Sequence, residues 1–315
     1  MSPEQPLADA LREALGPIAE KASQSLRKAQ RGDAGGVHDA RAALRRLRVG
    51  LGLMGRTVFD PSKTASFARA LRRIERALGP TRDDDVFIED VDAWLVDEKP
   101  AAAHAVAPLR HTLVERRGAH ARVLARRLRR DKARRALRKL SRWLSGRPRD
   151  VIAQPKNPAK APRWLVRHFV YDEVWRSYEE ILAFELRQPA DFDVIHKVRG
   201  ACRRLRFTLE LLDGAVSGAD RVIEPLRQLQ DRLGRMHDDV VSIRRLERWL
   251  KTGQVSRNRA VTAYAARRAR SQDRLRAEFD REWRALSGQS LRGALFRVLA
   301  GGATEGRPLR AGPAA

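Results

Sequence analysis

The sequence predicts an all-α protein of two tandem helical bundles, related by an internal duplication (a pseudo-twofold), with a basic central groove or channel. Three observations lead to this fold class. Apolar residues recur at spacings of three and four along nearly the whole 315-residue chain, and the alternating pattern of β-strands is hard to find. Ala, Leu and Arg, which favour helices, dominate the periodic segments. The third observation is a repeated motif, described below.

Glycine and proline separate the periodic segments and predict where helices end. We interpret Gly79-Pro80 and Gly234 as helix stops, and Thr81 as the cap of the helix that follows. The predicted helices cover residues 4–30, 36–56, 62–79, 82–97, 103–145, 163–187, 193–213, 220–234, 237–251 and 256–285, with a short helix at 289–299.

Two segments are predicted to lack regular structure. Residues 145–162 contain four prolines and few apolar side chains, which is typical of a linker. Residues 301–315 form a tail that we expect to be disordered. The linker divides the chain into a first helical-bundle repeat at residues 1–144 and a second at 163–300.

The two halves resemble each other in sequence. Residues 37–54 align with 195–212 at an offset of 158, and residues 78–88 align with 233–243 at an offset of 155. Identical pairs include His38/His196, Arg41/Arg199, Arg45/Arg203, Arg46/Arg204, Arg48/Arg206, Asp83/Asp238 and Asp84/Asp239. Two blocks in the same order at nearly the same offset indicate a tandem duplication of one helical unit.

The first repeated block places a basic stripe beside an apolar helix face. On a helical wheel, the stripe spans about 80° and contains His38, Arg41, Arg45 and Arg48. The core face carries Ala40, Leu44, Leu47, Leu51 and Met54. The second repeat has the same stripe with His196, Arg199, Arg203 and Arg206. Arg46 and Arg204 fall on the far side of their helices.

Asp33 and Asp191 precede the two histidines by five residues and are candidate N-caps. Each histidine would then lie near a helix N-terminus, where the dipole favours anions. A charge beside the core is costly unless it is paired or holds a ligand. One interpretation is therefore a solvated face with salt bridges to neighbouring acids. The other is that two stripes face each other across the pseudo-twofold axis and form a basic groove.

The charge of the chain points to a polyanionic partner. Lys and Arg total 65 against 39 Asp and Glu, so the formal net charge is +26. Nucleic acid, an acidic membrane surface and a phosphate polymer are the candidates. Residues 116–142 hold much of the excess and form either a solvated helix face or a second wall of the anion site.

Several other classes of protein are disfavoured. Cys202 is the single cysteine, so a disulfide framework within the chain and a multi-cysteine zinc site are excluded, and we expect it to be a small core residue. The sequence has no Walker A loop, dinucleotide fingerprint or nucleophile elbow. It shows no secretory signal and no apolar run long enough to span a membrane.

A metal phosphohydrolase site was considered at His237-Asp238. The aligned position in the first half is Arg82-Asp83, and a guanidinium is not a metal ligand. What the two halves share is a positive side chain that can meet phosphate, so Arg82 and His237 join the candidate binding residues and no metal or cofactor is expected. Asp83 and Asp238 are expected to cap helices and to pair with arginines of the stripes.

The motif H-x-x-R-x-x-x-R-R-L-R, followed some 40 residues later by L-G-x-x-[RH]-D, resembles the CHAD family, the conserved-histidine α-helical domain. The resemblance covers both halves. It implies two helical bundles around a basic cavity that binds inorganic polyphosphate, and association with polyphosphate granules in some bacteria. The CYTH-type triphosphatase often fused to such domains, with its E-x-E-x-K signature, is lacking here. The implied phosphate-contacting residues are His38, Arg41, Arg45, Arg46, Arg48, His196, Arg199, Arg203, Arg204 and Arg206.

We therefore predict a cytoplasmic, non-catalytic module that binds inorganic polyphosphate. The main alternative is a basic helical protein that binds nucleic acid, although single-strand binders usually interleave aromatic residues, and the two stripes contain none. A metal-dependent phosphohydrolase is the third alternative.

Overall fold

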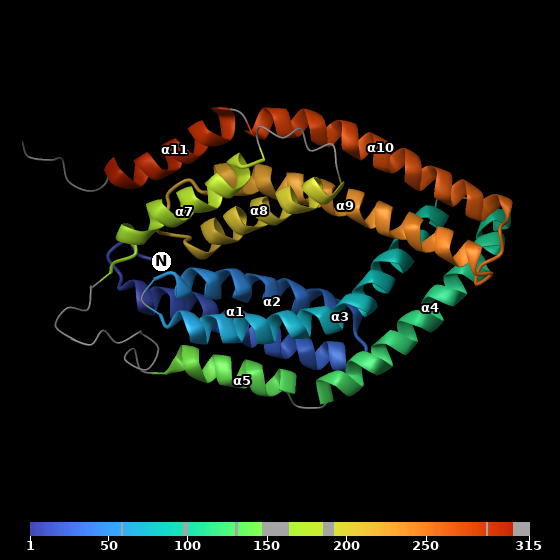
Figure 1. Cartoon of the computed structure of the whole chain (residues 1–315), viewed down its shortest axis with the longest axis horizontal. Helices are drawn as coiled ribbons and strands as arrows, with labels where there is room; N and C mark the ends of the chain where they lie inside the picture. The colour runs from blue at the N-terminus through green and yellow to red at the C-terminus, as the bar shows by residue number, and fades with distance from the viewer. Residues whose placement is uncertain are drawn as a thin grey trace, which may run out of the picture. The chain divides into compact units, whose positions relative to one another are not determined.

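The computed structural model describes residues 1–57, 59–96, 100–129, 132–146, 164–184, 192–287 and 289–304. Its helices are α1 (Leu7–Gln30), α2 (Ala34–Gly55), α3 (Pro61–Val96), α4 (Pro100–Arg129), α5 (Lys132–Ser145), α7 (Arg167–Leu182), α8 (Phe192–Leu211), α9 (Asp220–Lys251), α10 (Arg259–Ser287) and α11 (Gln289–Thr304) (Figure 1). Among the described residues the only β-type pairing is an isolated bridge between Pro6 and Leu165. The predicted all-α fold class is confirmed.

The chain forms two compact units. The first contains Met1–Ala10, Pro162–Leu233 and Phe279–Ala315, and the second contains Leu11–Ala161 and Gly234–Glu278. Each unit takes residues from both sides of the predicted linker, so the units are not the two sequence halves. The duplication, the repeat boundaries and the basic groove stay predictions.

In the second unit, α2 packs along α3, and α3 packs on α4 and α5 (Figure 1). Helix α1 approaches α2 closely at two glycines. A Cβ on Gly36 would lie 2.7 Å from the backbone nitrogen of Ala29, and one on Gly50 would lie 2.4 Å from Leu15. Both distances are shorter than real Cβ contacts. A larger residue at Gly36 would push the two helices apart, whereas one at Gly50 would displace the side chain of Leu15.

Helix α3 is a single helix of 36 residues, so the stop predicted at Gly79-Pro80 is wrong. Proline lacks an N–H donor and costs about 3 kcal/mol inside a helix. The apolar face on both sides of it outweighs that cost, because Leu78 and Phe87 are both buried. Thr81 is buried inside the helix and is not a cap. Helix α9 likewise runs through Gly234, so that predicted stop is also wrong.

The remaining helix ends differ from the prediction in detail. The drift of the apolar positions in the helix predicted at 103–145 also predicts a bend or break near Asp131, and the structure has two helices there, of which α4 ends at Arg129 and α5 begins at Lys132. Helix α11 extends to Thr304, so residues 301–304 are helical instead of disordered. Most of the predicted linker and residues 305–315 of the predicted tail lie outside the described residues.

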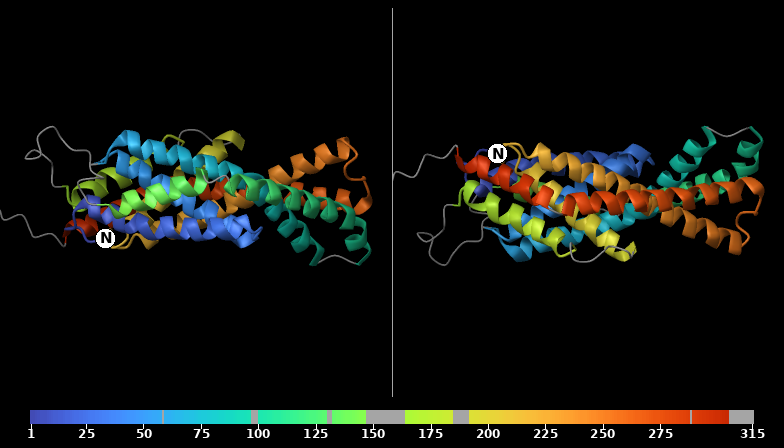
Figure 2. Two further views of the ribbon diagram at one scale, coloured as in Figure 1. Left: turned by 90° about the horizontal axis from the view of Figure 1, so that it is seen from below. Right: turned by 90° about the horizontal axis from the view of Figure 1, so that it is seen from above.

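An aromatic core in the second unit joins α3 and α4 to α9 and α10, the two helix pairs seen in both views of Figure 2. The rings of Phe87 and Trp249 stack with centroids 5.9 Å apart. Trp94 meets Tyr264 edge to face at 5.5 Å. Trp94 and Trp249 are separated by 155 residues, the same offset as the second repeated block, and both are buried in this core. Such pairs fix the positions of the helices that carry the charged side chains described below.

In the first unit, α7 packs against α8. The N-terminal residues are tied to the segment before α7, because Leu7 donates its backbone N–H to the carbonyl of Trp164 at 2.9 Å. Cys202 on α8 is fully buried, which confirms its predicted place in the core, and burial raises the pKa of its thiol to about 12. No described helix has the length and apolar character needed to cross a membrane.

Candidate anion-binding site

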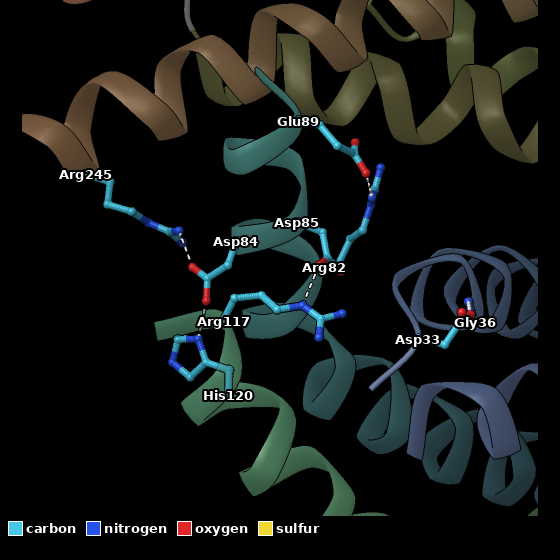
Figure 3. Close-up of polar contacts among 9 residues, drawn as sticks. All are labelled: Asp33, Gly36, Arg82, Asp84, Asp85, Glu89, Arg117, His120 and Arg245. Carbon is cyan, nitrogen blue, oxygen red and sulfur yellow. Dashed lines mark hydrogen bonds and ion pairs between the residues drawn. The ribbon is translucent and has the colours of Figure 1, made fainter. Parts of the chain in front are cut away.

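Helix α2 carries the first basic stripe, and its start is fixed by a local cap. Asp33 has extended backbone angles, and its side chain accepts a hydrogen bond from the backbone N–H of Gly36 (Figure 3). This confirms Asp33 as the N-cap. The cap places His38 in the first turns of the helix, where its side chain is exposed. The corresponding residue of the second repeat, Asp191, lies outside the described residues.

Two arginines of the stripe share one carboxylate on α3. Arg45 Nε donates to Glu75 Oε1 at 2.9 Å, and Arg48 Nη1 donates to Glu75 Oε2 at 2.5 Å. Only 13% of the Glu75 side chain is exposed. Burial alone would raise the pKa of Glu75, but the hydrogen bonds and charges of Arg48 and Arg45 outweigh it and hold the pKa below its ordinary value. Glu75 therefore stays ionised and orients both guanidinium groups.

Arg41 is surrounded by charged side chains of both signs. Its Nη1 is 3.9 Å from Asp83 Oδ1, which is the predicted pairing of Asp83 with the stripe. Burial lowers the pKa of Arg41, and the positive charges of Arg45 and Arg82 act in the same direction. Asp83 and Glu75 oppose this shift. The lowered pKa therefore reflects mainly the burial of the guanidinium, and an anion placed beside it would stabilise its charged form.

The other predicted residues of the second unit differ in their exposure and partners. Arg82 donates to Glu89 Oε1 at 2.9 Å, and Glu89 is largely exposed (Figure 3). Arg46 is exposed, as its place on the far side of the wheel predicted. His237 on α9 is half-buried. The structure thus brings Arg41, Arg45, Arg48 and Arg82 together on α2 and α3, while His38 and Arg46 point into solvent.

Helix α8 carries the second stripe, in the first unit. Arg199, Arg203 and Arg206 are half-buried along the helix, whereas His196 and Arg204 are exposed. Arg204 forms an ion pair with Glu180 of α7. Arg206 lies 4.9 Å over the ring of Phe207 and 3.7 Å from Glu210. The half-buried positions match those of Arg41, Arg45 and Arg48 in the first repeat.

The structure shows a buried charge network that the sequence analysis did not assign. Asp84 on α3 is fully buried and accepts hydrogen bonds from Arg245 Nη1 at 2.6 Å and from His120 Nδ1 at 2.5 Å (Figure 3). Its neighbour Asp85 accepts from Arg117 Nε at 2.8 Å. These partners come from α4 and α9, so adjacent acids on α3 hold both helices. The Asp-Asp pair that occurs in both halves of the sequence was the signal that could have indicated this network.

Asp239, the residue aligned with Asp84, is also bound by a cation from another helix. Arg268 Nη1 on α10 donates to Asp239 Oδ1 at 2.6 Å, and Arg268 also pairs with Asp90 of α3. Tyr264 donates its hydroxyl to Asp90 at 2.5 Å. Burial raises the pKa of Asp239 to about 6, against the opposing hydrogen bond from Ser271, and burial lowers the pKa of Arg268 to about 10.

These geometries allow electrostatic binding of an anion by fixed guanidinium groups. Among the described residues, no group of three or more His, Cys, Asp or Glu side chains has the arrangement of a metal site. The carboxylates Asp84 and Asp85 are already occupied by cationic side chains from the same unit. Their contribution is to hold α3, and with it Glu75 and Asp83, against the neighbouring helices.

The helical fold and its half-buried arginines define the class of protein as a basic, all-α domain. The chain belongs to the CHAD domain family, whose model matches residues 9–247 and again residues 186–303. This membership confirms the resemblance found in the sequence. No curated protein matches the chain.

Solved structures with the same fold include two CHAD-related chains. The crystal structure of the CHAD domain from the plant Ricinus communis has a TM-score of 0.64 and 21% sequence identity, covering 98% of this chain and 94% of that one. PptA from Streptomyces chartreusis has a TM-score of 0.65 and 17% identity, covering 89% of this chain and 99% of that one. At these identities the likeness concerns the fold.

Proposed function

We propose that this protein binds inorganic polyphosphate through the half-buried arginine stripes, without catalysing a reaction on it. The observation that carries the proposal is the α2 stripe, where Arg45 and Arg48 share the single carboxylate of Glu75. One carboxylate orients both guanidinium groups but neutralises only one of them. A phosphate chain supplies the missing negative charge and accepts the remaining N–H donors in bidentate fashion.

Partial burial makes each of these contacts stronger than an exposed ion pair. The guanidinium of Arg41 has already lost much of its hydration, so it gives up little more when a phosphate displaces the remaining water. Exposed ion pairs, by contrast, contribute at most about 1 kcal/mol. The equivalent half-buried positions on α8 offer a second set of donors. We expect the exposed residues His38, Arg46, His196 and Arg204 to contribute less.

Membership of the CHAD family supports polyphosphate as the polyanion. The stripes themselves disfavour nucleic acid, because they offer no exposed aromatic ring for base stacking. The ring next to the α8 stripe, Phe207, is buried and lies beneath Arg206. We further propose that the protein acts in the cytoplasm and meets polyphosphate at granules, since its role is to bind the polymer.

The test is competition binding of long-chain polyphosphate against duplex DNA and RNA at near-physiological salt. Polyphosphate should remain bound when DNA is added at equal phosphate concentration. A variant carrying Arg41→Gln, Arg45→Gln and Arg48→Gln should bind polyphosphate at least tenfold more weakly, because about 1.5 kcal/mol is lost per charged contact. Gln retains a donor for Glu75, which limits damage to the fold.

A matched control carries Arg69→Gln, Arg72→Gln and Arg73→Gln on α3. These arginines are exposed, so the variant loses the same net charge without touching the stripe. If the control loses as much affinity as the stripe variant, binding reflects overall charge and the proposed site is wrong. Displacement of polyphosphate by DNA would point to nucleic acid instead. Release of phosphate from the polymer by purified protein would contradict the proposed absence of catalysis.

A further inference from the structure

The second unit contains a cavity of about 630 Å³ that none of the predicted binding residues lines. Its walls come from α3, α9 and α10. The charged residues that line it are Arg235, Arg267, Arg268, Arg270, Arg274 and Asp90. The cavity thus gathers five guanidinium groups around one carboxylate, a stronger local excess of positive charge than the α2 stripe has.

The arrangement follows from the spacing of residues on α10. Arg267, Arg270, Ser271 and Arg274 occur at intervals of three and four, which places them on one face of the helix. The opposite wall is formed by Ala93 and Trp94 of α3, which present apolar surface. Arg235, Arg267, Arg270 and Arg274 are themselves exposed, so water screens each charge, and an anion is attracted by several of them acting together.

The carboxylate in the cavity is already satisfied. Asp90 pairs with Arg268 and accepts the hydroxyl hydrogen bond of Tyr264. Arg268, which also lines the cavity, therefore forms ion pairs with both Asp90 and Asp239. Arg274 is 3.9 Å from Glu278, a long contact on the same helix, and within the described ranges Arg235 and Arg270 make no ion pair within 4 Å. Arg235 and Arg274 also interact electrostatically with the carboxylate of Asp239. The five lining arginines still outnumber Asp90 and Asp239, so positive charge is left for an anion to neutralise.

We infer that this cavity is a second phosphate site, which binds a short chain of two or more phosphate groups. A single carboxylate ligand carries too little charge to meet several guanidinium groups at once. A triphosphate has a high charge density and many acceptor oxygens, which suits bidentate arginine contacts. The hydroxyl of Ser271 already donates to Asp239, so the donors available to a phosphate are those of the arginines. The inference goes beyond the proposed stripe function and shares no residue with it.

Two sources could supply this chemistry, namely inorganic phosphate chains and nucleoside triphosphates. Isothermal titration of the full chain with inorganic triphosphate and, separately, with ATP distinguishes them. Tighter binding of triphosphate supports the inorganic chain, and tighter binding of ATP supports a nucleotide whose phosphates occupy the cavity. Either result supports the cavity only if the binding survives in the α2 stripe variant and is lost in the cavity variant described next. If neither probe binds at physiological ionic strength, the inference is overturned.

Location is tested with the variant Arg270→Gln plus Arg274→Gln. This variant should weaken triphosphate binding about tenfold, because it removes two of the exposed guanidinium contacts. The matched control is Arg257→Gln plus Arg259→Gln, which removes two exposed arginines at the start of α10 and should change the affinity less than twofold. Far-UV circular dichroism checks that both variants fold. Equal loss in both variants would overturn the inference.

The α2 stripe variant separates this inference from the proposed function. It should lose long-chain polyphosphate binding while it keeps triphosphate binding in the cavity. If the stripe variant loses triphosphate binding and the cavity variant keeps it, the second site is wrong and the stripe function stands. If the stripe variant keeps its binding of long-chain polyphosphate, the stripe function fails. The second site is still supported in that case if only the cavity variant loses triphosphate binding.

Discussion

The buried carboxylate of Asp84 accepts a hydrogen bond from Arg245 Nη1 at 2.6 Å, across 161 residues of sequence. His120 binds the other oxygen of the same carboxylate. One side chain of α3 thereby holds a residue of α4 and a residue of α9. The three groups are placed together within the second unit, next to the aromatic core that contains Phe87 and Trp249.

Removal of this carboxylate should destabilise the protein strongly. Asp84→Ala leaves Arg245 and His120 without their common acceptor in a partly buried environment, which costs roughly 3 kcal/mol or more. The matched control is Asp92→Ala, because Asp92 pairs with Arg110 at 2.6 Å on the exposed surface. The control should cost less than about 1 kcal/mol. Urea unfolding measures both, and similar midpoints for the two variants would contradict a special role for Asp84.

The pH dependence of stability should report on Asp239. Its pKa is about 6 in the folded state against 3.8 ordinarily, so the folded state binds its proton more tightly than the unfolded state. This contribution favours folding below about pH 4 and is lost as the pH rises through 6. The Tm of Asp239→Asn minus that of the wild type should therefore increase between pH 4 and pH 7. A difference that stays constant would show that Asp239 titrates normally.

Polyphosphate binding should weaken steeply with salt, because each arginine contact releases condensed counterions. Replacement of Arg45 and Arg48 by Gln should also lower the slope of log affinity against log salt. By analogy with single-stranded nucleic acid, the change should be about 0.7 for each contact removed. Titrations at several salt concentrations measure the slope. A weaker affinity with an unchanged slope would mean that these arginines shape the site without touching phosphate.

The contact between α1 and α2 should be intolerant of side chains at Gly36. Gly36→Ala places a Cβ 2.7 Å from the backbone nitrogen of Ala29, which cannot move without displacing α1. We expect a loss of about 2 kcal/mol. Gly16→Ala on α1 is the control, since nothing lies within 4 Å of its added Cβ. It should stabilise the helix by about 0.5–1 kcal/mol, and thermal melts that show both variants alike would contradict this packing.

The local features of the protein were predictable from sequence. The N-cap at Asp33, the buried Cys202 and the basic stripe beside the core all depend on residues within a few turns of one helix. Helix periodicity fixes which face a side chain occupies, and so it predicted that Arg41 would lie near the core edge. The same reasoning failed at Pro80, where distant packing outweighs a local preference.

The amino-acid sequence by itself determined the helical fold, the family and the small set of positive side chains that occurs in both halves. Only the tertiary structure decided the partners of those charges. Glu75 was not recognised as the acid that orients Arg45 and Arg48, nor Asp84 as the acceptor for Arg245. The reason is physical: periodicity specifies the direction of a side chain on its own helix, whereas an ion pair depends on which helix packs against it.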